Sequence, residues 1–594
     1  MATSSSQKSP THPAREPVPA NAVREQLARV VNSPGFVSSA RLTRFLTHIV
    51  NRTIDGDLDS LKEFSIAMEV FDRTADYDPN IDAIVRVEAR RLRSKLKAYY
   101  EEGPGRNDSI LIGLRPGSYV PIFRWLETGP QENRNETGTS IQPRRVSVAV
   151  LPFVNMSPEP EQDYFCDGIS DEIINALTRV SELNVIARTS AFQFKGVAVD
   201  IREVGQRLGA DLVIEGSVRK AGMELRIAAQ AIDSESGHHL WSQTFRRELK
   251  DIFRIQEEIA ESVAGLLRLQ MPEARVRSSA RNLDAHTRYL RARFLIYQQS
   301  PEARRVALEQ LHELIELFPD YAPAYSGVAA AIGLLCFFGV VSGRDMYPEV
   351  KANAERGYAL DPDSGETCTV LGGVRACFEY RWEEADRLYE RGLELQPGHA
   401  TAHMFRAITS LGRGNILAAE AGFRRAAELD PISASGCARM GYLHYVKGDY
   451  RSAAEHLRRS LDLDRDYPET RLYEGLLRFQ QQDYDGVIQC LSSSSVPLDI
   501  GLTAAAHARK GSESQARKCI EKLSRLAGGE YVTPLAEAFA AIGLGDHDLA
   551  FHRLEEAIEH KTNFVNLVAV EPFFDPLRSD ARFSRLLKTL NLPR

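Results

Sequence analysis

From about Asp284 onward the chain repeats with a period of 34 residues, and this repeat constrains the fold more than any other feature. Two series of small residues keep the period, and a larger apolar residue follows the second series by one helical turn. The first series is Gly373, Ala407, Gly441 and Gly475, the second is Ala385, Ala419 and Ala453, and the apolar residues are Tyr389, Phe423, Leu457 and Leu491. Small residues at this spacing indicate paired helices that cross closely. Such pairs cannot bury their own apolar faces, so we expect them to stack into a superhelix with a concave groove.

A proline marks the junction between units at Pro397 and Pro431, and Arg465 takes that position in the next unit. With these prolines the pattern resembles the tetratricopeptide (TPR) signature, which implies an all-α solenoid over residues 284–594. A degenerate last unit keeps Ala538, Ala550 and Ala557, and residues 575–580 are a plausible cap.

The groove of such a solenoid is expected to be lined by the first helix of each pair. Its candidate binding residues are Arg406, Arg439, His444, Arg471 and Arg478. Cations at these positions are suited to clamp a carboxylate or a peptide terminus, which predicts a protein or peptide partner. For any one of them the alternative is an ordinary solvated position.

The second informative feature is a basic helix predicted over residues 81–99. One apolar stripe follows the helical period, and a second stripe of cations lies about a third of a turn away. The apolar stripe is Val85, Ala89, Leu92, Leu96 and Tyr99, and the cationic stripe is Arg86, Arg90, Arg93 and Lys97. A helix with one face in a core and an adjacent face of cations can lie against a phosphate backbone or enter a major groove.

Two amphipathic stretches, 42–50 and 61–71, precede this helix, and two strand-like runs around Arg115-Pro116-Gly117 follow it. The order helix, helix, basic helix, hairpin resembles the winged-helix domain of OmpR/PhoB-type and CadC-like regulators. The motif Arg91-Leu92-Arg93-Ser94-Lys95-Leu96 and the wing end Gly117-Ser118-Tyr119 carry the resemblance, whereas the segment 72–80 is longer than in the family. The resemblance implies binding of double-stranded DNA over residues 21–126. The candidate DNA-binding residues are Arg86, Arg90, Arg91, Arg93, Lys95, Lys97 and Arg115.

Charge distribution favours the same part of the chain. Residues 21–126 hold 16 Lys and Arg against 14 Asp and Glu, whereas the whole chain has a net charge of −7. Only this N-terminal part therefore has an electrostatic reason to meet nucleic acid. The alternative is a solvated basic face on a protein-binding domain.

A third unit is expected between a disordered tail (1–20), a linker (127–145) and the repeats. Over residues 146–270, strands at 146–153 and 184–188 alternate with helices at 164–180 and 201–208. Strands at 211–219, 224–233 and 239–246 then run consecutively before a helix at 252–269, which indicates an α/β sandwich. The motifs Ala149-Val150-Leu151-Pro152-Phe153, Asp167-Gly168-Ile169, Gly209-Ala210-Asp211, Glu215-Gly216-Ser217-Val218 and Leu240-Trp241-Ser242 resemble the N-terminal domain of TolB. We interpret the acidic residues Asp167, Asp171 and Glu172 as helix N-terminal charges rather than a site.

The N-terminus lacks the apolar core of a signal peptide, and the seven cysteines form no C-x-x-C pair, so a cytoplasmic protein is expected. The uncharged run Tyr325 to Val341 is in phase with the repeats, which favours a buried repeat helix over a membrane span.

Proteins with this three-part architecture are sometimes labelled adenylate cyclases, but no stretch here resembles a cyclase catalytic domain. No nucleotide-binding, zinc-protease or hydrolase motif is present. We therefore predict no catalytic residues, no metal and no cofactor. The leading hypothesis is a one-component transcriptional regulator of bacterial type, and the alternative is a TPR interaction scaffold without DNA binding.

Overall fold

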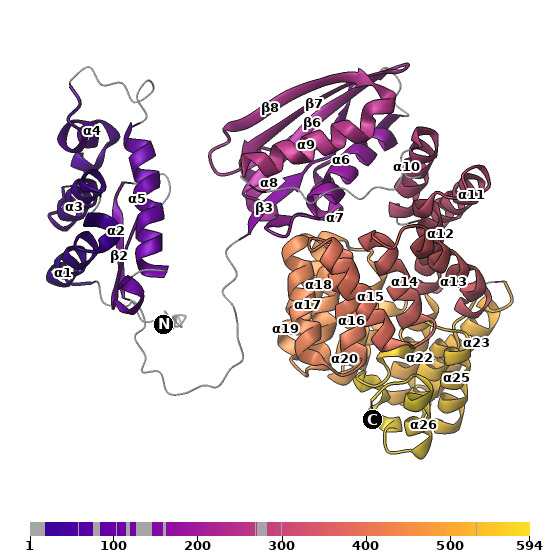
Figure 1. The fold of residues 1–594 in the computed structure, drawn as a ribbon. Coiled ribbons are helices and arrows are strands. Elements are labelled where there is room, and N and C mark those ends of the chain that lie inside the picture. The colour runs from indigo at the N-terminus through magenta and orange to yellow at the C-terminus, as the bar shows by residue number, and fades with distance from the viewer. Residues whose placement is uncertain are drawn as a thin grey trace, which may run out of the picture. The chain divides into compact units, whose positions relative to one another are not determined.

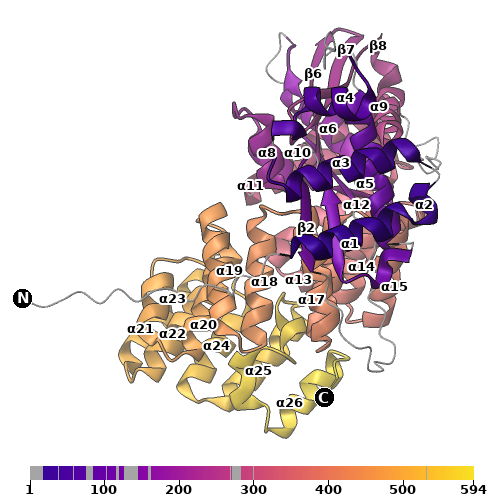
Figure 2. The same cartoon turned by 90° about the vertical axis from the view of Figure 1, so that its left-hand side faces the viewer.

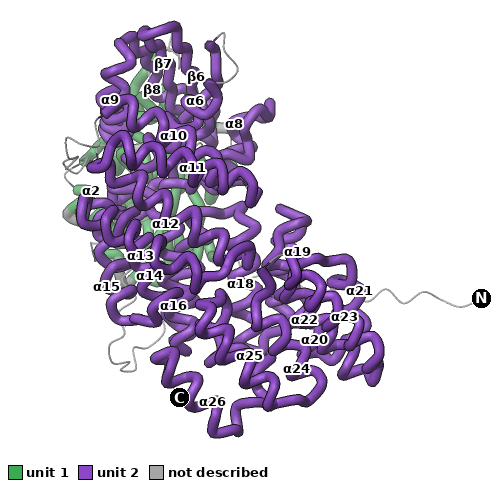
Figure 3. Tube along the Cα trace, turned by 90° about the vertical axis from the view of Figure 1, so that its right-hand side faces the viewer, with its two compact units in different colours: residues 1–141 green, residues 142–594 purple. Residues whose placement is uncertain are grey.

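The computed structural model of the chain describes residues 18–37, 39–57, 59–74, 84–101, 104–114, 119–125, 145–157, 162–267, 269, 282–298, 300–529 and 531–593. It divides into two compact units, residues 1–141 and 142–594 (Figure 3). The predicted tail, most of the predicted linker and the turn at 115–118 lie outside the described residues.

The first unit is a set of helices closed by a hairpin (Figure 1). Its elements are α1 (Ala20–Val31), α2 (Pro34–Val37), α3 (Ala40–Ile54), α4 (Glu63–Phe71), α5 (Ile84–Glu101), β1 (Ile110–Leu114) and β2 (Pro121–Trp125). The predicted helices at 42–50, 61–71 and 81–99 correspond to α3, α4 and α5, and the two strand-like runs pair antiparallel from Ile110↔Trp125 to Leu114↔Pro121. The sequence analysis missed α1, whose buried Val23, Leu27 and Val30 follow the helical period.

The second unit begins with a mixed sheet in the order β5-β3-β6-β7-β8, with β4 also paired to β6. Its strands are β3 (Val146–Val150), β4 (Val154–Asn155), β5 (Leu183–Val185), β6 (Leu212–Ala221), β7 (Glu224–Asp233) and β8 (His239–Glu248). β5, β3 and β6 pair in parallel, whereas β6, β7 and β8 pair antiparallel. The helices are α6 (Asp163–Leu177), α7 (Arg188–Ala191), α8 (Ile201–Leu208) and α9 (Ile252–Leu266). Three of them, α6, α8 and α9, correspond to predicted helices, whereas α7 was not predicted and begins at the last residue of the strand expected at 184–188.

Alternation along β3 sends its side chains to two cores. Val148 and Val150 pack with α6 and α9 on one face of the sheet, while Ala149 and Leu151 pack with Phe194 and α8 on the other. Helices therefore cover both faces of the parallel part. β8 lies at the sheet edge with most of its residues exposed.

Paired helices form the rest of the second unit, a TPR-like solenoid (Figures 1 and 2). They are α10 (Leu283–Tyr297), α11 (Pro301–Leu317), α12 (Ala322–Phe337), α13 (Gly343–Leu360), α14 (Gly365–Cys377), α15 (Trp382–Leu395), α16 (Ala400–Gly412), α17 (Ile416–Leu429), α18 (Ala434–Val446), α19 (Tyr450–Leu463), α20 (Pro468–Gln480), α21 (Tyr484–Leu491), α22 (Pro497–Arg509), α23 (Glu513–Leu526), α24 (Pro534–Leu544), α25 (His547–Glu559) and α26 (Ala581–Thr589). The uncharged run at 325–341 is largely α12, as predicted. Among the described residues, no helix is long and apolar enough to cross a bilayer.

The 34-residue period acts through close packing within each pair. A Cβ atom at Gly441 of α18 would lie 2.8 Å from Leu457 Cγ of α19 and 3.2 Å from the Ala453 carbonyl oxygen. The equivalent Gly373 has more room, since a Cβ there would lie 4.0 Å from Tyr389 Oη, and the adjacent Gly372 makes the close approach to the Tyr389 ring. The glycine of the 34-residue series thus makes the close helix contact in α18, whereas in α14 the residue before it makes that contact.

A second 34-residue series, which the sequence analysis missed, lies in the turn inside each pair. Tyr380, Gly414, Gly448 and Gln482 all adopt positive φ angles. The left-handed conformation lets the chain leave one helix and start the next, and glycine adopts it without steric cost. The residue after this position caps the second helix in three of these pairs, through the side chains of Asn415, Asp449 and Asp483.

The sheet and the solenoid are joined by buried contacts. Leu290 of α10 packs into the sheet's core beside Gly168, where an added Cβ would lie 2.6 Å from Leu290 Cδ1. On the other side of the sheet, the Ala187 amide donates to the Leu429 carbonyl at 2.7 Å, and Ser190 Oγ donates to Asp430 at 2.5 Å. These contacts make residues 142–594 one compact unit.

Candidate functional site

Helix α5 has the apolar stripe that its sequence predicts. Val85, Ala89, Leu92, Leu96 and Tyr99 are all buried in the core of the first unit. Glu88 is also buried, at 5% exposure, and pairs with Arg91 at 2.9 Å and Arg41 at 4.0 Å. The sequence analysis did not single out Glu88, although it lies on the edge of the apolar stripe, one turn from Val85 and Leu92.

The candidate DNA-binding residues lie in different environments. Arg86 and Arg91 are exposed on α5, although Arg86 pairs with Glu63 at 3.1 Å. Arg93 is half-buried, and Lys95 Nζ donates to Ser39 Oγ at 2.7 Å. The side chains of Arg90 and Lys97, and all of Arg115, lie outside the described residues. The helix therefore presents at least Arg86 and Arg91 to solvent.

A polar network fixes the hairpin against α5. Asp108 accepts hydrogen bonds from Tyr99 Oη at 2.8 Å and from Gln26 Nε2 at 2.5 Å. Tyr100 Oη in turn accepts from the Ile112 amide of β1 at 3.0 Å. Burial is the main cause that raises the pKa of Tyr99, and its bond to Asp108 adds to it. The network joins α1, α5 and β1, so the exposed face of α5 is held on a rigid support.

In the solenoid, each predicted groove cation has an acidic partner within the chain. Arg406 pairs with Asp386 and Glu390, His444 with Asp449, Arg471 with Asp466, and Arg478 with Glu474 and Asp483. Arg439 is buried, pairs with Glu469, and donates to Tyr473 Oη at 2.6 Å. A role for these residues in clamping a partner stays a prediction, but a ligand carboxylate would have to compete with these partners.

The chain's own C-terminal segment packs against the first helices of several pairs. Residues 560–593 contact α14, α16, α18, α20 and α24, and this segment is drawn in yellow in Figures 1 and 2. The buried carboxylate of Glu571 accepts hydrogen bonds from Tyr442 and Tyr445 of α18 at 2.7 and 2.6 Å. The sequence analysis expected a terminal cap, whereas this segment occupies part of the inner face expected to hold a partner.

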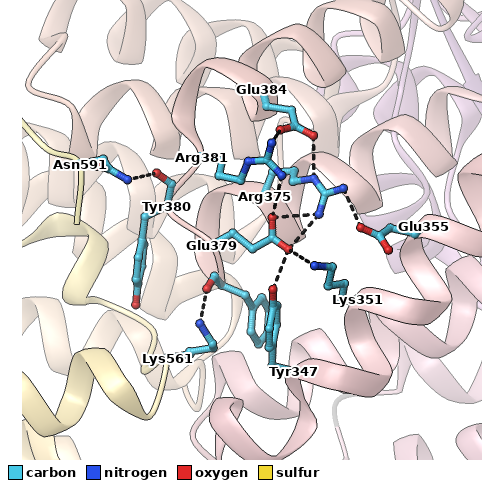
Figure 4. Close-up of polar contacts among 11 residues, drawn as sticks. Tyr347, Lys351, Glu355, Arg375, Glu379, Tyr380, Arg381, Glu384, Lys561 and Asn591 are labelled. Carbon is cyan, nitrogen blue, oxygen red and sulfur yellow. Dashed lines mark hydrogen bonds and ion pairs between the residues drawn. The ribbon is translucent and has the colours of Figure 1, made fainter. Parts of the chain in front are cut away.

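Figure 4 shows where this segment meets α14 and α15. Lys561 Nζ donates to the Phe378 carbonyl at 2.6 Å, and Asn591 Nδ2 donates to the Tyr380 carbonyl at 3.3 Å. Beside them the buried Arg375 bonds Glu379, Glu384 and Glu355 at 2.8–2.9 Å. All three guanidinium nitrogens thus bond carboxylates within the chain, which indicates a structural cluster.

A cavity of about 850 Å³ lies between the sheet layer and the solenoid. Its walls come from α6 and α9, from the helices α10 to α16, and from residues 561–566 of the C-terminal segment. Aromatic side chains line it, including Phe253, Tyr289, Tyr321 and Phe337. The sequence could not indicate this cavity, because its walls are far apart along the chain.

Charged groups at one wall of the cavity are paired. Arg293 of α10 lies 3.2 Å from Asp171 and 3.3 Å from Glu172, both on α6. Burial raises the pKa of Glu172 to about 7, and the Arg293 charge opposes that rise. Arg188 lies 3.8 Å from Asp167 and 3.7 Å from Asp171, and Lys195 pairs with Asp167. The acidic residues of α6 thus form ion pairs with cations from α7, from the segment after α7 and from α10. The interpretation of these residues as helix N-terminal charges did not include this role.

His286 of α10 also faces this cavity. Its Nδ1 lies 3.2 Å from Tyr321 Oη. Burial lowers the pKa of His286 to about 4, and repulsion from Arg293 adds to the effect. The ring is therefore neutral at neutral pH. Among the described residues, no group of three or more His, Cys, Asp or Glu could hold a metal ion.

Comparison with known proteins gives one family match. Residues 144–262, which span the mixed sheet with α6 to α9, match the second domain of HilA/YgeH-like transcriptional regulators. This part of the chain is therefore similar to a domain of transcriptional regulators.

A protein of Rhizobium meliloti (strain 1021), named putative adenylate cyclase 3, is 36% identical over 255 residues. The match covers 41% of this chain and 43% of that protein, so the chain spans less than half the length of this relative.

Among solved structures, the APC/C hetero-tetramer Cut9–Hcn1 is 16% identical with a TM-score of 0.33, covering 57% of this chain and 59% of that one. A tetratricopeptide repeat protein from Parabacteroides merdae ATCC 43184 is 14% identical with a TM-score of 0.30, covering 42% and 93%. Structural similarity this low gives no information about the function of this chain.

Proposed function

We propose that this chain is a one-component transcriptional regulator that binds double-stranded DNA through α5 of its first unit. The observation that carries the proposal is the division of α5 into a buried apolar stripe and an exposed face with Arg86 and Arg91. Guanidinium groups on an exposed helix suit phosphate oxygens and guanine edges. The match of residues 144–262 to a transcriptional regulator's domain supports the same function.

The surroundings of α5 agree with a recognition helix of winged-helix type. Val87, at 47% exposure, lies one turn before Arg91 on the same face, and a small apolar side chain there suits a thymine methyl group. The hairpin β1–β2 follows the helix directly, in the position of a wing. We place this DNA-binding domain at residues 21–126, a TolB-like domain at 146–270 and the repeats at 284–594.

For the second unit we propose that the sheet layer and the solenoid respond to a partner. The C-terminal segment occupies part of the inner face, and the predicted groove cations are paired within the chain. A peptide partner would therefore bind beside that segment or displace it.

DNA binding is tested with full-length protein and a fluorescent 30-base-pair duplex, by anisotropy over a series of salt concentrations. Replacing Arg91 and Arg93 by Gln should weaken binding and reduce the slope of log affinity against log salt by about 2, if both meet phosphates. The matched control replaces Arg254 and Arg288 by Gln, two exposed arginines of the second unit.

An unchanged slope in a folded Arg91/Arg93 double variant would remove these residues from the interface. Absence of any salt-dependent duplex binding by the wild type would favour the alternative, an interaction scaffold without DNA binding.

A further inference from the structure

The cavity between the sheet layer and the solenoid has the size of a small-molecule site. Its volume of about 850 Å³ falls within the range of roughly 300–1,000 Å³ that is usual for such sites. Its walls come from two structural layers and the C-terminal segment, so its shape depends on the assembled second unit.

Several buried polar atoms on residues that line this cavity have no hydrogen-bond partner in the described part of the chain. They are Gln256 Nε2 of α9, His286 Nε2 of α10, Arg304 Nε of α11 and Asn566 Oδ1 of the C-terminal segment. Each of these residues is at most 6% exposed. Buried polar groups are nearly always bonded, because an unmet bond costs about 1–3 kcal/mol. These atoms have almost no accessible surface themselves, so an occupant of the cavity could bond them only if the surrounding side chains moved.

Arg304 identifies the charge of that occupant. Among the described residues no carboxylate pairs with its guanidinium, and the guanidinium carbon lies 5.2 Å from the centre of the Phe338 ring. Arg293, which also lines the cavity, differs, since two carboxylates neutralise it. A buried guanidinium without an anion is costly, so an anion from outside the chain would stabilise it.

Part of the lining is apolar, although the lining also holds six carboxylates and, besides Arg304, four other cations. Phe253, Tyr289, Tyr321 and Phe337 supply aromatic surface, and Gly333 of α12 leaves open space where its Cβ would be. Such walls exclude water, and a low dielectric strengthens the attraction between Arg304 and an anion.

We propose that this cavity binds one small organic anion with an apolar body, whose acidic group pairs with Arg304 while its body lies against the aromatic walls. This site does not depend on the DNA-binding function proposed above.

The experiment uses full-length protein and two fluorescent probes with the same aromatic body. One is the anion 1-anilinonaphthalene-8-sulfonate, and the other is its uncharged analogue N-phenyl-1-naphthylamine. Wild-type protein should bind the anion saturably at one site. Arg304→Gln should weaken the anion at least about tenfold, because a hydrogen bond to a charged group contributes about 1.5–3 kcal/mol. The uncharged probe should bind both proteins alike.

Three further variants locate the probes and guard against misfolding. Gly333→Trp directs a ring into the cavity and should abolish binding of both probes. Gly265→Trp is the matched control, because it too is a helical glycine with open space around its Cβ, but it lies outside the cavity lining. Arg304→Lys keeps the charge and should retain most of the affinity for the anion.

The proposal is overturned if the wild type binds no anion saturably, or if Arg304→Gln weakens both probes equally. It is also overturned if Gly333→Trp and Gly265→Trp bind the anion equally well.

Discussion

The indole Nε1 of Trp382 donates a hydrogen bond to the backbone carbonyl oxygen of Leu590 at 2.7 Å, although 208 residues separate them. Trp382 starts α15, and Leu590 follows α26 at the end of the chain. Both residues are buried. The C-terminal segment is therefore part of the solenoid's core and not an appendage to its last repeat.

Replacing Trp382 with Phe should loosen this C-terminal segment. The variant leaves the Leu590 carbonyl buried without its donor, which costs about 1–3 kcal/mol. Faster amide exchange in residues 581–592 is the expected result. Trp241→Phe in β8 is the control, and equal exchange in both variants would mean that the bond does not hold the segment.

Gly441→Leu should destabilise the solenoid more than Gly373→Leu, although the two glycines occupy equivalent repeat positions. A side chain at Gly441 meets Leu457 and the Ala453 carbonyl, whereas Gly373 has space. Overpacking costs about 1–3 kcal/mol, so amide exchange should quicken in α18 and α19. Similar losses in the two variants would contradict the packing described here.

Gln482→Gly should stabilise the protein. Gln482 has a φ of 61° in the turn between α20 and α21, where two other pairs have Gly414 and Gly448. Glycine removes the strain of the left-handed conformation, which stabilises the folded state by about 1–2 kcal/mol. This gain exceeds the extra conformational entropy that glycine loses on folding, which costs about 0.4–1 kcal/mol. The urea unfolding midpoint should rise, whereas Gln481→Gly, at a φ of −79°, should not raise it.

His286 should make the protein less stable in acid. Its pKa of about 4 in the folded state lies below the ordinary value of about 6.5, so the unfolded state binds more protons between these values. The stability is fully present above pH 6.5 and falls by on the order of 3 kcal/mol as the pH drops toward 4.

The measurement is the urea unfolding midpoint between pH 7 and 4.5. His286→Asn should flatten its pH dependence, while exposed His552→Asn should not. Parallel curves for wild type and His286→Asn would show that the ring titrates normally.

Purified full-length protein is expected to form no cyclic nucleotide from ATP or GTP, despite the name of its Rhizobium relative. The reason is that no stretch of the sequence resembles a cyclase catalytic domain. Product formation that survives a second purification step and follows the protein peak would refute this expectation.

Local periodicity in the sequence was enough to predict the helix pairs and the buried face of α5. Leu457 and Ala453 are buried where the 34-residue step puts them, and Val85 and Leu92 are buried where the 3.6-residue period puts them. These features depend on residues a few turns apart, so a single stretch of sequence contains the information.

Contacts over long separations were decided only by the tertiary structure. The curvature of a solenoid sums small rotations over many pairs, and that sum brings Leu590 to Trp382 and Glu571 to Tyr442. The same holds for Arg293, which pairs with Asp171 across the joint between solenoid and sheet. Arg304 lines the cavity and pairs with no carboxylate in the described part of the chain. No local sequence pattern distinguishes these two arginines, because the difference lies in which groups the rest of the fold brings to each guanidinium.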